Sequence, residues 1–444
     1  MKSRSRSTWT RRVVAPVVAG AVALAGVVTV QARNNPVQAD QVQDPVAAWV
    51  EDNAVPVRTI DPAAPLDDFA HLRRSVGGAR VVGLGESVHG TREQTALKLR
   101  TMRYLVEELG FRSIAWEDDW TLGLLMNEYL QTGRGDLPAL VKQMSTAWRS
   151  HEIVEVLRWL RSYNATHRDK VRFAGVEYFT TRALAYEAVE EYVAKVAPRR
   201  LPEIREHLGP ITPKTPDMKA HLDWYLDPET DKAPYLAHAR AAYALVKSLP
   251  HRPGDRRYAV TLHHAKQILN WYEGFSLPSV FAHRDARAAE NLKWWTEFSG
   301  DKVVYWAAAA HVADAPGLRY VTPPYPDVSF PSVGSYMRDW YGQRYRTIAF
   351  TFDQGSLYGE GGPVVAPPSA ADWFEKKFES VNAAQFTLDL RRPAPRPVRD
   401  WLTAEAKTRG FPEAGLGSHM TGGSLAEWFD VIIHRRTVTP TRPL

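Results

Sequence analysis

The chain of 444 residues contains no cysteine. This absence excludes disulfides, a lipid-modified cysteine and thiolate chemistry, so the folded core alone must hold the protein together. A dense basic block is also missing, because the net charge of +6 comes from scattered arginines without a zinc-finger or RNA-binding signature. We therefore expect no nucleic-acid partner. The sequence also lacks an internal repeat and the metal-binding pattern H-E-x-x-H.

What is present is a composition typical of a globular protein. Hydrophobic residues make up 44% and charged residues 24%, and the 15 Trp and 18 Tyr are more aromatic side chains than average. This composition excludes disorder for most of the chain. Because the length exceeds the usual size of one hydrophobic core, we expect either one large domain with an inserted lid or two domains.

The one long apolar run, Val13–Val30, lies near the N-terminus and follows basic residues, namely Lys2, Arg4, Arg6, Arg11 and Arg12. This order is typical of an export signal, and Val30–Ala32 and Val37–Ala39 each fit a cleavage site. The paired arginines indicate the twin-arginine route. We expect residues 1–39 to be a signal peptide and linker of a secreted or extracytoplasmic protein that meets the membrane only there. The alternative is an uncleaved membrane anchor.

Six short apolar runs farther along predict strands that are buried on both faces. They cover residues 79–86, 113–117, 171–177, 303–311, 346–353 and 429–434. Between the first two, apolar residues near helical spacing predict a helix that ends at Gly110. Strand, helix and strand in this order favour a parallel sheet, so the predicted fold class is α/β with a mostly parallel central sheet flanked by helices.

Two further segments are predicted to be helical. One helix begins near Val46, after a linker rich in Pro and Asn. Residues 180–300 carry no comparable strand signal, and we expect them to form a helical lid over the sheet. The stretch from Tyr320 to Pro331 is dense in proline and predicts loops.

All six runs end in an ionisable residue: Glu86, Glu117, Glu177, His311, Asp353 and His434. Ligands bind outside the carboxyl ends of the strands in parallel α/β sheets, so most of these side chains are expected in one crevice. His89 follows the first strand, and its neutral ring can accept a proton near pH 7, as a general base must. Glycines at 83, 85 and 90 permit close approach of backbone and substrate.

Purely structural roles are open for the same residues. Glu86 could cap the following helix. Glu117 could begin a solvated acidic cluster with Asp118 and Asp119. His311 could be a hydrogen-bonded core histidine.

Two other chemistries also use this region. Ser87 stands in a segment similar to the serine-hydrolase elbow, but that motif needs glycine two residues later, where His89 is found. His89, His311 and one carboxylate could form a facial metal triad, although the ligands lie far apart in the sequence.

From Val46 to Thr437 the chain resembles the erythromycin esterase family. The Gly-Glu-x-x-His-Gly motif of that family is matched at residues 85–90, and LVEELGF is found at residues 105–111. The other matches follow in the order of the family: Glu93, Leu97, Lys98, Glu117, Arg284, Asp285, Ala289, Asn291, His311, Phe429 and Asp430. The resemblance implies one hydrolase domain over residues 40–444 that opens a small-molecule ester or macrolactone without a metal or other cofactor.

The resemblance also implies roles for individual residues. His89 is the base and Glu86 orients its ring, while Glu117 and His311 hold the water or the substrate hydroxyls. Arg284 stabilises the oxyanion, a contribution that is typically about 3 to 4 kcal/mol. Three more residues are expected near the substrate: Lys98 adds to the field of the site, Arg92 makes the pocket more cationic, and Trp271 belongs to an apolar wall.

One departure from the family leaves other functions open. The late strand of the family usually reads Ala-His-Asn-Ala-His, whereas residues 307–311 read Ala-Ala-Ala-Ala-His. Alanine at Ala308 could mark a different substrate, or a biosynthetic dehydratase or cyclase. The alternative of another class is a non-catalytic protein that binds a metal or haem through His263, His264, His283 and Trp271.

Overall fold

The computed structural model describes residues 44–359 and 361–444. The expected signal peptide, residues 1–39, lies outside these residues. Within the described part of the chain, no helix has both the length and the apolar character needed to cross a membrane.

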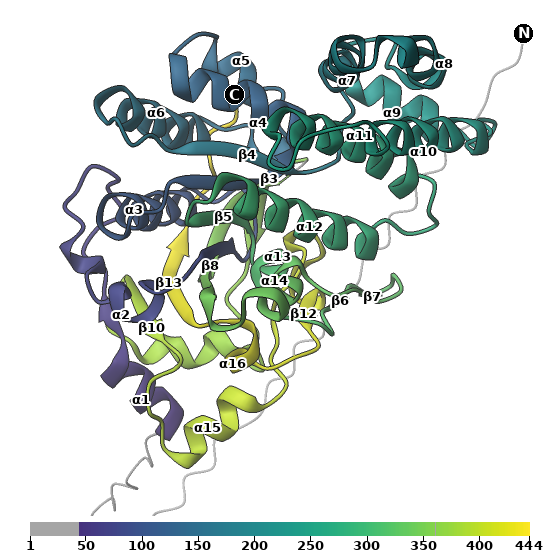
Figure 1. Ribbon diagram of the computed structural model, residues 1–444. Coiled ribbons are helices and arrows are strands. Elements are labelled where there is room, and N and C mark those ends of the chain that lie inside the picture. Colours follow the sequence, from purple (N-terminus) through teal and green to yellow (C-terminus); the bar gives the residue numbers. More distant parts are fainter. Residues whose placement is uncertain (1–43, 360) are drawn as a thin grey trace, which may run out of the picture. The chain divides into compact units, whose positions relative to one another are not determined.

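A central sheet of nine strands forms the middle of the domain, with the order β1-β10-β13-β8-β2-β5-β3-β4 and β9 paired to β8 (Figure 1). The strands are β1 (Val55–Pro56), β2 (Val81–Glu86), β3 (Ser113–Asp119), β4 (Arg172–Glu177), β5 (Val303–Ala308), β8 (Tyr345–Gly359), β9 (Gly362–Ala366), β10 (Gln385–Asp389) and β13 (Val431–Val438). The pairs from β13 through β8, β2, β5 and β3 to β4 are parallel, and β1, β9 and β10 pair antiparallel. The predicted mostly parallel α/β fold is therefore confirmed.

All six predicted strands are present, but several end elsewhere than predicted, since β8 continues to Gly359 and β13 to Val438. The run expected over residues 303–311 leaves the sheet at Ala308, and Ala309–Val312 form the short helix α13. His311 consequently lies on a helical turn rather than at the end of a strand.

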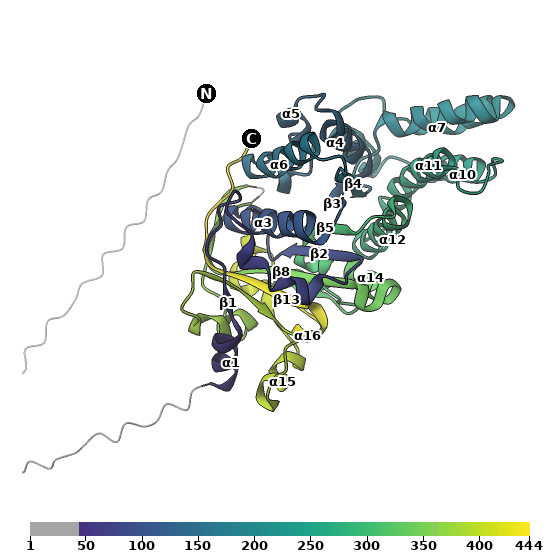
Figure 2. The same cartoon turned by 60° about the vertical axis from the view of Figure 1, so that its left-hand side comes forward.

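Helices cover both faces of the sheet, as Figures 1 and 2 show for α3 on one side and α12 and α14 on the other. The helices before β5, apart from those of residues 180–300, are α1 (Pro45–Asn53), α2 (Leu72–Val76), α3 (Arg92–Leu109), α4 (Trp120–Thr132), α5 (Leu137–Val141) and α6 (His151–Thr166). Alternate residues of each strand feed two cores, so Val82 packs with α3 and α6 while Val81 packs with α12 and α14.

The two helices whose ends were predicted have the expected boundaries. Helix α1 begins after Asp44, whose Oδ1 atom accepts a hydrogen bond of 2.9 Å from the Val46 amide. Helix α3 ends at Gly110, which adopts the left-handed conformation with φ of 72°.

The regular secondary structure of residues 180–300 is all helical, as predicted. They form α7 (Ala183–Val196), α8 (Leu201–Ile211), α9 (Met218–Leu226), α10 (Ala233–Lys247), α11 (Arg256–Gly274) and α12 (Phe281–Ser299). Helices α7 to α11 enclose a hydrophobic core of their own, whereas α12 packs against β3 and β4. The role of this region as a lid stays a prediction.

A second, four-stranded sheet has the order β11-β12-β6-β7. Its strands are β11 (Thr408–Arg409), β12 (His419–Thr421), β6 (Arg319–Val321) and β7 (Val328–Ser329). The prediction of loops alone for residues 320–331 was therefore wrong, because backbone pairing with distant segments places two short strands there. The remaining helices are α14 (Val333–Tyr341), α15 (Arg396–Thr403) and α16 (Leu425–Trp428), with single-turn or short 3-10 segments at 67–69, 146–148, 198–200, 342–344, 374–380 and 412–417.

Candidate active site

The turn that follows β2 is held by close packing at two glycines. A Cβ atom at Gly85 would lie 2.6 Å from the Cα atom of Ala309, so only glycine lets α13 rest against β2. Gly90 has φ of 81°, and a Cβ atom there would lie 2.1 Å from the carbonyl oxygen of Tyr358. The backbone on both sides of His89 is thus fixed by contacts that exclude a side chain.

His89, Glu86 and Lys98 form a connected chain of polar groups. The Nδ1 atom of His89 lies 2.7 Å from Oε1 of Glu86, and the other carboxylate oxygen contacts Nζ of Lys98. Lys98 also donates to the carbonyl oxygen of Ala307 at 3.1 Å. Burial lowers the pKa of Lys98 to about 8, and the attraction of Glu86 opposes a larger fall. Glu86 is therefore a fixed acceptor for the His89 ring.

The outer nitrogen of His89 faces the cavity. Its Nε2 atom lies 4.0 Å from Oε2 of Glu117, and 31% of the side chain is exposed, against 5% for Glu86. Trp148 packs edge-on against the ring with centroids 4.5 Å apart, and its Nε1 donates to the Glu117 carbonyl at 2.9 Å. With the proton on Nδ1 toward Glu86, the free electron pair of Nε2 is directed at the cavity.

Glu117 is an ionised carboxylate despite its burial. Its Oε1 accepts from Arg284 at 2.6 Å and its Oε2 accepts from the Ala308 amide at 2.8 Å. Burial alone would raise the pKa of Glu117, but attraction to His311, Arg284 and His89 and the hydrogen bond from the Ala308 amide outweigh it and lower the pKa to about 2. An acceptor is thus maintained beside His89 at any physiological pH.

Arg284 is surrounded by acceptors. In addition to Glu117, its guanidinium lies 2.9 Å from a carboxylate oxygen of Glu177, and its Nη1 lies 2.8 Å from Nε2 of His311. Glu177 is fully buried, and this burial raises its pKa to about 7 although Arg284 pulls it down. The cation of Arg284 is therefore largely compensated by protein groups.

His311 is fixed from its other side by Asp285. Its Nδ1 lies 2.9 Å from Oδ2 of Asp285, which also accepts from the Val333 amide at 3.1 Å. The contact with Arg284 requires a neutral ring, because a guanidinium can only donate to Nε2. Burial and Arg284 lower the pKa of His311, whereas Asp285 and Glu117 raise it. The two acids have the larger effect, so the pKa of His311 lies above its usual value. If His311 is protonated, its Nε2 loses the hydrogen bond from Arg284 and can instead donate to Oε1 of Glu117, which lies 3.3 Å away.

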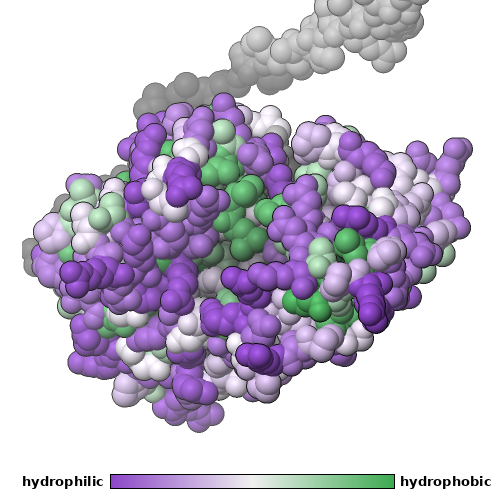
Figure 3. Space-filling view, turned by 45° about the horizontal axis from the view of Figure 1, so that its top comes forward, coloured by the Kyte–Doolittle hydropathy of each residue, from purple (hydrophilic) through white to green (hydrophobic). Residues whose placement is uncertain are grey.

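These groups line one cavity of about 520 Å³. His89, Glu117, Arg284 and His311 all contribute to it, so the structure brings four predicted site residues together, with Glu86 directly behind His89. Aromatic side chains supply much of the remaining wall: Phe281, Tyr320, Phe330, Tyr358 and Phe411. One face of the molecule is hollowed, and apolar surface gathers in the hollow between hydrophilic flanks (Figure 3).

Three residues expected near the substrate lie elsewhere. Arg92 is exposed and lines a separate depression beside α6, because the first turn of α3 points away from the cavity. Trp271 is buried in the core of the helical region, where its Nε1 donates to the Phe179 carbonyl at 3.3 Å. Lys98 is buried behind Glu86 and does not reach the cavity. The substrate-contacting roles predicted for these residues are therefore corrected.

Four of the six predicted strand ends do not line this cavity: Glu86 lies directly behind His89, Glu177 is buried beside Arg284, and Asp353 and His434 lie elsewhere. Asp353 and His434 line a different cavity of about 210 Å³, where the His434 ring packs against Phe378. Strand β8 continues past Asp353 to pair with β9, and β13 continues past His434 to Val438, so neither position is the end of its strand.

The histidines proposed as cofactor contacts pack within the helical region. His263 stacks on Trp294 with ring centroids 3.8 Å apart, and His264 accepts from Trp120 Nε1 at 3.3 Å. Burial lowers the pKa of both rings. Among residues 44–359 and 361–444, no three or more His, Asp or Glu side chains are grouped as a metal ion requires.

Some contributors to the site could not be chosen from the sequence. Asp285 was only part of the Arg-Asp motif, and its contact with His311 joins residues 26 apart. Trp148 carried no signal, since it comes from a 3-10 turn between α5 and α6. The Ala308 amide is a backbone group, which an alanine stretch does not reveal.

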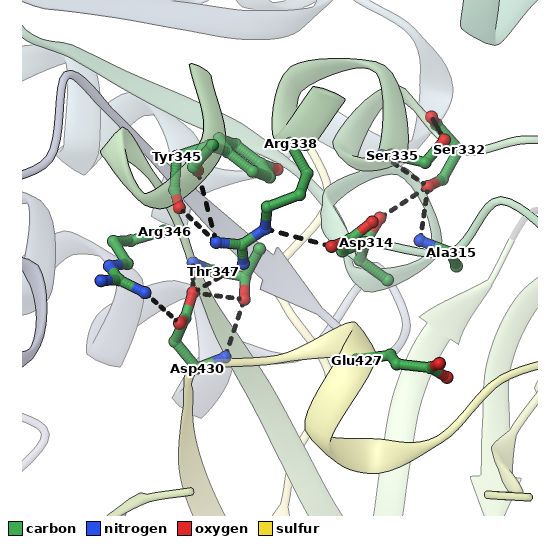
Figure 4. Close-up of polar contacts among 12 residues, drawn as sticks. Asp314, Ala315, Ser332, Ser335, Arg338, Tyr345, Arg346, Thr347, Glu427 and Asp430 are labelled. Carbon is green, nitrogen blue, oxygen red and sulfur yellow. Dashed lines mark hydrogen bonds and ion pairs between the residues drawn. The ribbon is translucent and has the colours of Figure 1, made fainter. Parts of the chain in front are cut away.

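Asp430 of the closing Phe-Asp motif lies outside the cavity, in an ion-pair network (Figure 4). It accepts from Arg346 at 2.7 Å, from Arg338 at 3.1 Å and from the Thr347 amide at 3.0 Å. These contacts join the start of β13 to the start of β8 and to α14. The motif residue is thus a structural link.

Comparison with known proteins decides the family. The model of the erythromycin esterase family matches residues 106–438. The chain belongs to the erythromycin esterase family. Membership in this family indicates a hydrolase.

Relatives of the erythromycin esterase family are distant from this chain. Erythromycin esterase type II of Escherichia coli is 31% identical over 129 residues, and the alignment covers 29% of this chain and 30% of that relative. The putative hydrolase YbfO of Bacillus subtilis (strain 168) is 20% identical over 423 residues, which are 88% of this chain and 91% of YbfO.

Solved structures share the fold over most of the chain. A Bacillus cereus protein superposes with a TM-score of 0.77 at 25% identity, covering 90% of this chain and 98% of that one. A succinoglycan biosynthesis protein gives 0.75 at 26% identity, with 90% and 98% covered. The erythromycin esterase EreC, a histidine-to-asparagine mutant in its open conformation, gives 0.66 at 17% identity, with 86% and 97% covered, and this likeness shows the fold alone.

Proposed function

We propose that this erythromycin esterase family member hydrolyses a carboxylic ester or macrolactone, with His89 activating the attacking water and no metal taking part. The observation that carries the proposal is the pairing of His89 Nδ1 with Glu86 at 2.7 Å, which leaves Nε2 facing the cavity. A histidine oriented by a carboxylate is the usual arrangement of a general base.

The reaction follows from this arrangement. Water bound between His89 Nε2 and Glu117 attacks the ester carbon, and its proton passes to Nε2. The tetrahedral intermediate then expels the alcohol oxygen, which takes that proton from His89. Atoms balance, since one water is added and an acid and an alcohol are released. Proton transfer by a positioned side chain typically contributes about 10²- to 10⁴-fold to the rate.

Arg284 and His311 support Glu117 in this scheme. Arg284 donates to Glu117 at 2.6 Å, and Asp285 fixes the His311 ring, whose Nε2 lies 3.3 Å from Oε1 of the same carboxylate. These contacts keep Glu117 ionised and in one position, which is the requirement for orienting a water molecule.

The cavity wall favours a substrate with an apolar body. Phe281, Phe330 and Tyr320 line the cavity with the polar groups, and a volume of about 520 Å³ is within the range of sites for small molecules. Erythromycin, the substrate in the names of two relatives, is one candidate within this ester class.

The experiment that tests the reaction class is product analysis in heavy-oxygen water. The purified protein is incubated with a series of 4-nitrophenyl esters and with erythromycin. Incorporation of one heavy oxygen into the acid product, together with loss of the product in His89→Asn, supports the proposal. Product formed without the label would indicate elimination or cyclisation and contradict it.

Export is the second part of the proposal and rests on residues 1–39 alone. Replacing Arg11 and Arg12 by lysine should retain the protein in the cytoplasm, because twin-arginine export reads that pair. Cell fractionation with an antibody measures the result. Unchanged export of the lysine variant would contradict the twin-arginine route.

A further inference from the structure

The group expected to stabilise the oxyanion, Arg284, is already engaged. Its guanidinium meets Glu117 at 2.6 Å, Glu177 at 2.9 Å and His311 at 2.8 Å. With Nη1 and Nη2 already engaged by these groups, Arg284 offers few N–H donors to a new negative charge. Another donor beside His89 is therefore sought in the cavity wall.

Ser87 lies in that wall, two residues before His89. Its backbone amide donates to the Phe350 carbonyl at 2.8 Å, which anchors it next to the end of β2. Ser87 is half-buried and lines this cavity, and it also borders a smaller adjoining one that shares Tyr320 with it. It has no part in the proton transfer described above.

Gln94 determines which way the Ser87 hydroxyl can donate. The Gln94 Nε2 atom donates to the Phe350 carbonyl at 2.6 Å and to Ser87 Oγ at 3.0 Å, while its Oε1 accepts from Thr91 at 2.8 Å. A flipped amide would place two carbonyl oxygens in contact, so this orientation is fixed. Ser87 Oγ must then accept from Gln94, and its own hydrogen points elsewhere.

No protein group takes that hydrogen within the described part of the chain, where Gln94 is the one hydrogen-bond partner of Ser87 Oγ. A half-buried hydroxyl donor at a cavity wall, with its acceptor side occupied, is suited to bind an oxygen of the ligand.

We propose that Ser87 is the oxyanion donor of the reaction and that Gln94 is the positioning residue that turns its hydrogen into the cavity. When water adds to the ester carbon, the electron pair of the C=O bond moves to the carbonyl oxygen, and the Ser87 hydroxyl donates to that oxygen. No bond to Ser87 forms. The inference rests on the proposed function, because it needs the same tetrahedral intermediate.

Ser87→Ala tests the inference with 4-nitrophenyl butyrate as substrate. We expect kcat to fall by about 10²-fold with KM within a few-fold, as for the loss of one oxyanion donor. Ser87→Thr keeps a hydroxyl and should retain activity within a few-fold. The exposed Ser380→Ala is the matched control, and thermal unfolding of each variant shows that the fold is kept.

Gln94→Leu tests the positioning role, because leucine keeps a side chain of similar size but cannot donate to Ser87 Oγ. It should lower kcat less than Ser87→Ala does, and the double variant should lose no more than Ser87→Ala alone. Additive losses would contradict the role of Gln94.

One result would overturn the inference while the proposed function stands: a Ser87→Ala variant with wild-type kcat beside an inactive His89→Asn. An acyl group on Ser87, found by rapid-quench mass spectrometry, would overturn both the inference and the direct attack of water, since Ser87 would then be a nucleophile. Wild-type protein that hydrolyses none of the esters, or a fully active His89→Asn, would overturn the proposed function itself.

Discussion

The Nδ1 atom of His89 lies 2.7 Å from Oε1 of Glu86, while the opposite oxygen of that carboxylate contacts buried Lys98. The Glu86 carboxylate therefore orients the His89 ring with one oxygen and pairs with the Lys98 ammonium group through the other. A buried carboxylate without such partners would be costly, so Lys98 is expected to stabilise the Glu86–His89 pair.

Lys98→Met should destabilise the protein and reduce activity together. Removing one partner of a buried ion pair typically costs about 3 to 5 kcal/mol, because Glu86 is left as an uncompensated charge. Urea unfolding and ester hydrolysis measure the two effects. The double variant Lys98→Met/Glu86→Gln should recover stability without recovering activity. A Lys98→Met protein as stable and active as the wild type would refute the pairing.

Glu177→Gln should stabilise the protein above neutral pH. The pKa of Glu177 is raised from 4.5 to about 7 by burial, so its contribution to stability is fully present below pH 4.5 and is lost as the pH rises through 7. A shift of this size corresponds to about 3 kcal/mol. The Gln variant cannot ionise, and its advantage in the free energy of unfolding should appear between pH 4.5 and 7 and persist above. The exposed Glu229→Gln serves as the control. A difference from wild type that does not change with pH would count against the raised pKa.

Asp430→Asn should unfold more easily without a change in catalysis. The buried carboxylate compensates Arg346 and Arg338, and its loss is expected to cost about 3 to 5 kcal/mol. Its kcat, measured on folded protein, should stay within a few-fold of wild type. Asp327→Asn breaks an exposed pair with Arg319 and should cost about 0.5 kcal/mol or less. Equal stability of the two variants would show that the network in Figure 4 has no structural role.

Phe281→Ala should raise KM for esters with a long acyl chain, whereas Trp271→Phe should leave KM unchanged. Phe281 lines the cavity, but Trp271 is buried in the core of the helical region. Loss of an apolar contact of this size is worth about 1.5 to 3 kcal/mol, or roughly 10-fold or more in KM. Steady-state kinetics across 4-nitrophenyl esters measures it. If instead Trp271→Phe raised KM and Phe281→Ala did not, Trp271 would belong to the apolar wall of the cavity, as the sequence predicted.

The sequence was sufficient for the features that depend on local pattern. Buried runs predicted the strands, Gly110 marked the end of α3, and the order of strand and helix predicted a parallel sheet. This sheet brings Glu117 to the cavity and Glu86 directly behind His89. These features follow from periodicity and from the geometry of parallel strands.

Features that depend on pairing between distant segments could not be obtained in this way. The strand that contains Asp353 continues into a hairpin with β9, which removed Asp353 from the site. Trp271 was assigned by its chemistry to the cavity, but packing within α7 to α11 buries it in another core. Lys98 was expected near the substrate, but it lies behind Glu86, where it contacts that carboxylate and the Ala307 carbonyl.

His89→Asn tests the central claim most directly, measured as kcat for the best 4-nitrophenyl ester in stopped-flow or steady-state assays with matched thermal unfolding. If His89 is the base, kcat should fall by about 10²- to 10⁴-fold while KM stays within a few-fold and the fold is intact. A folded His89→Asn protein with the kcat of the wild type would contradict the mechanism.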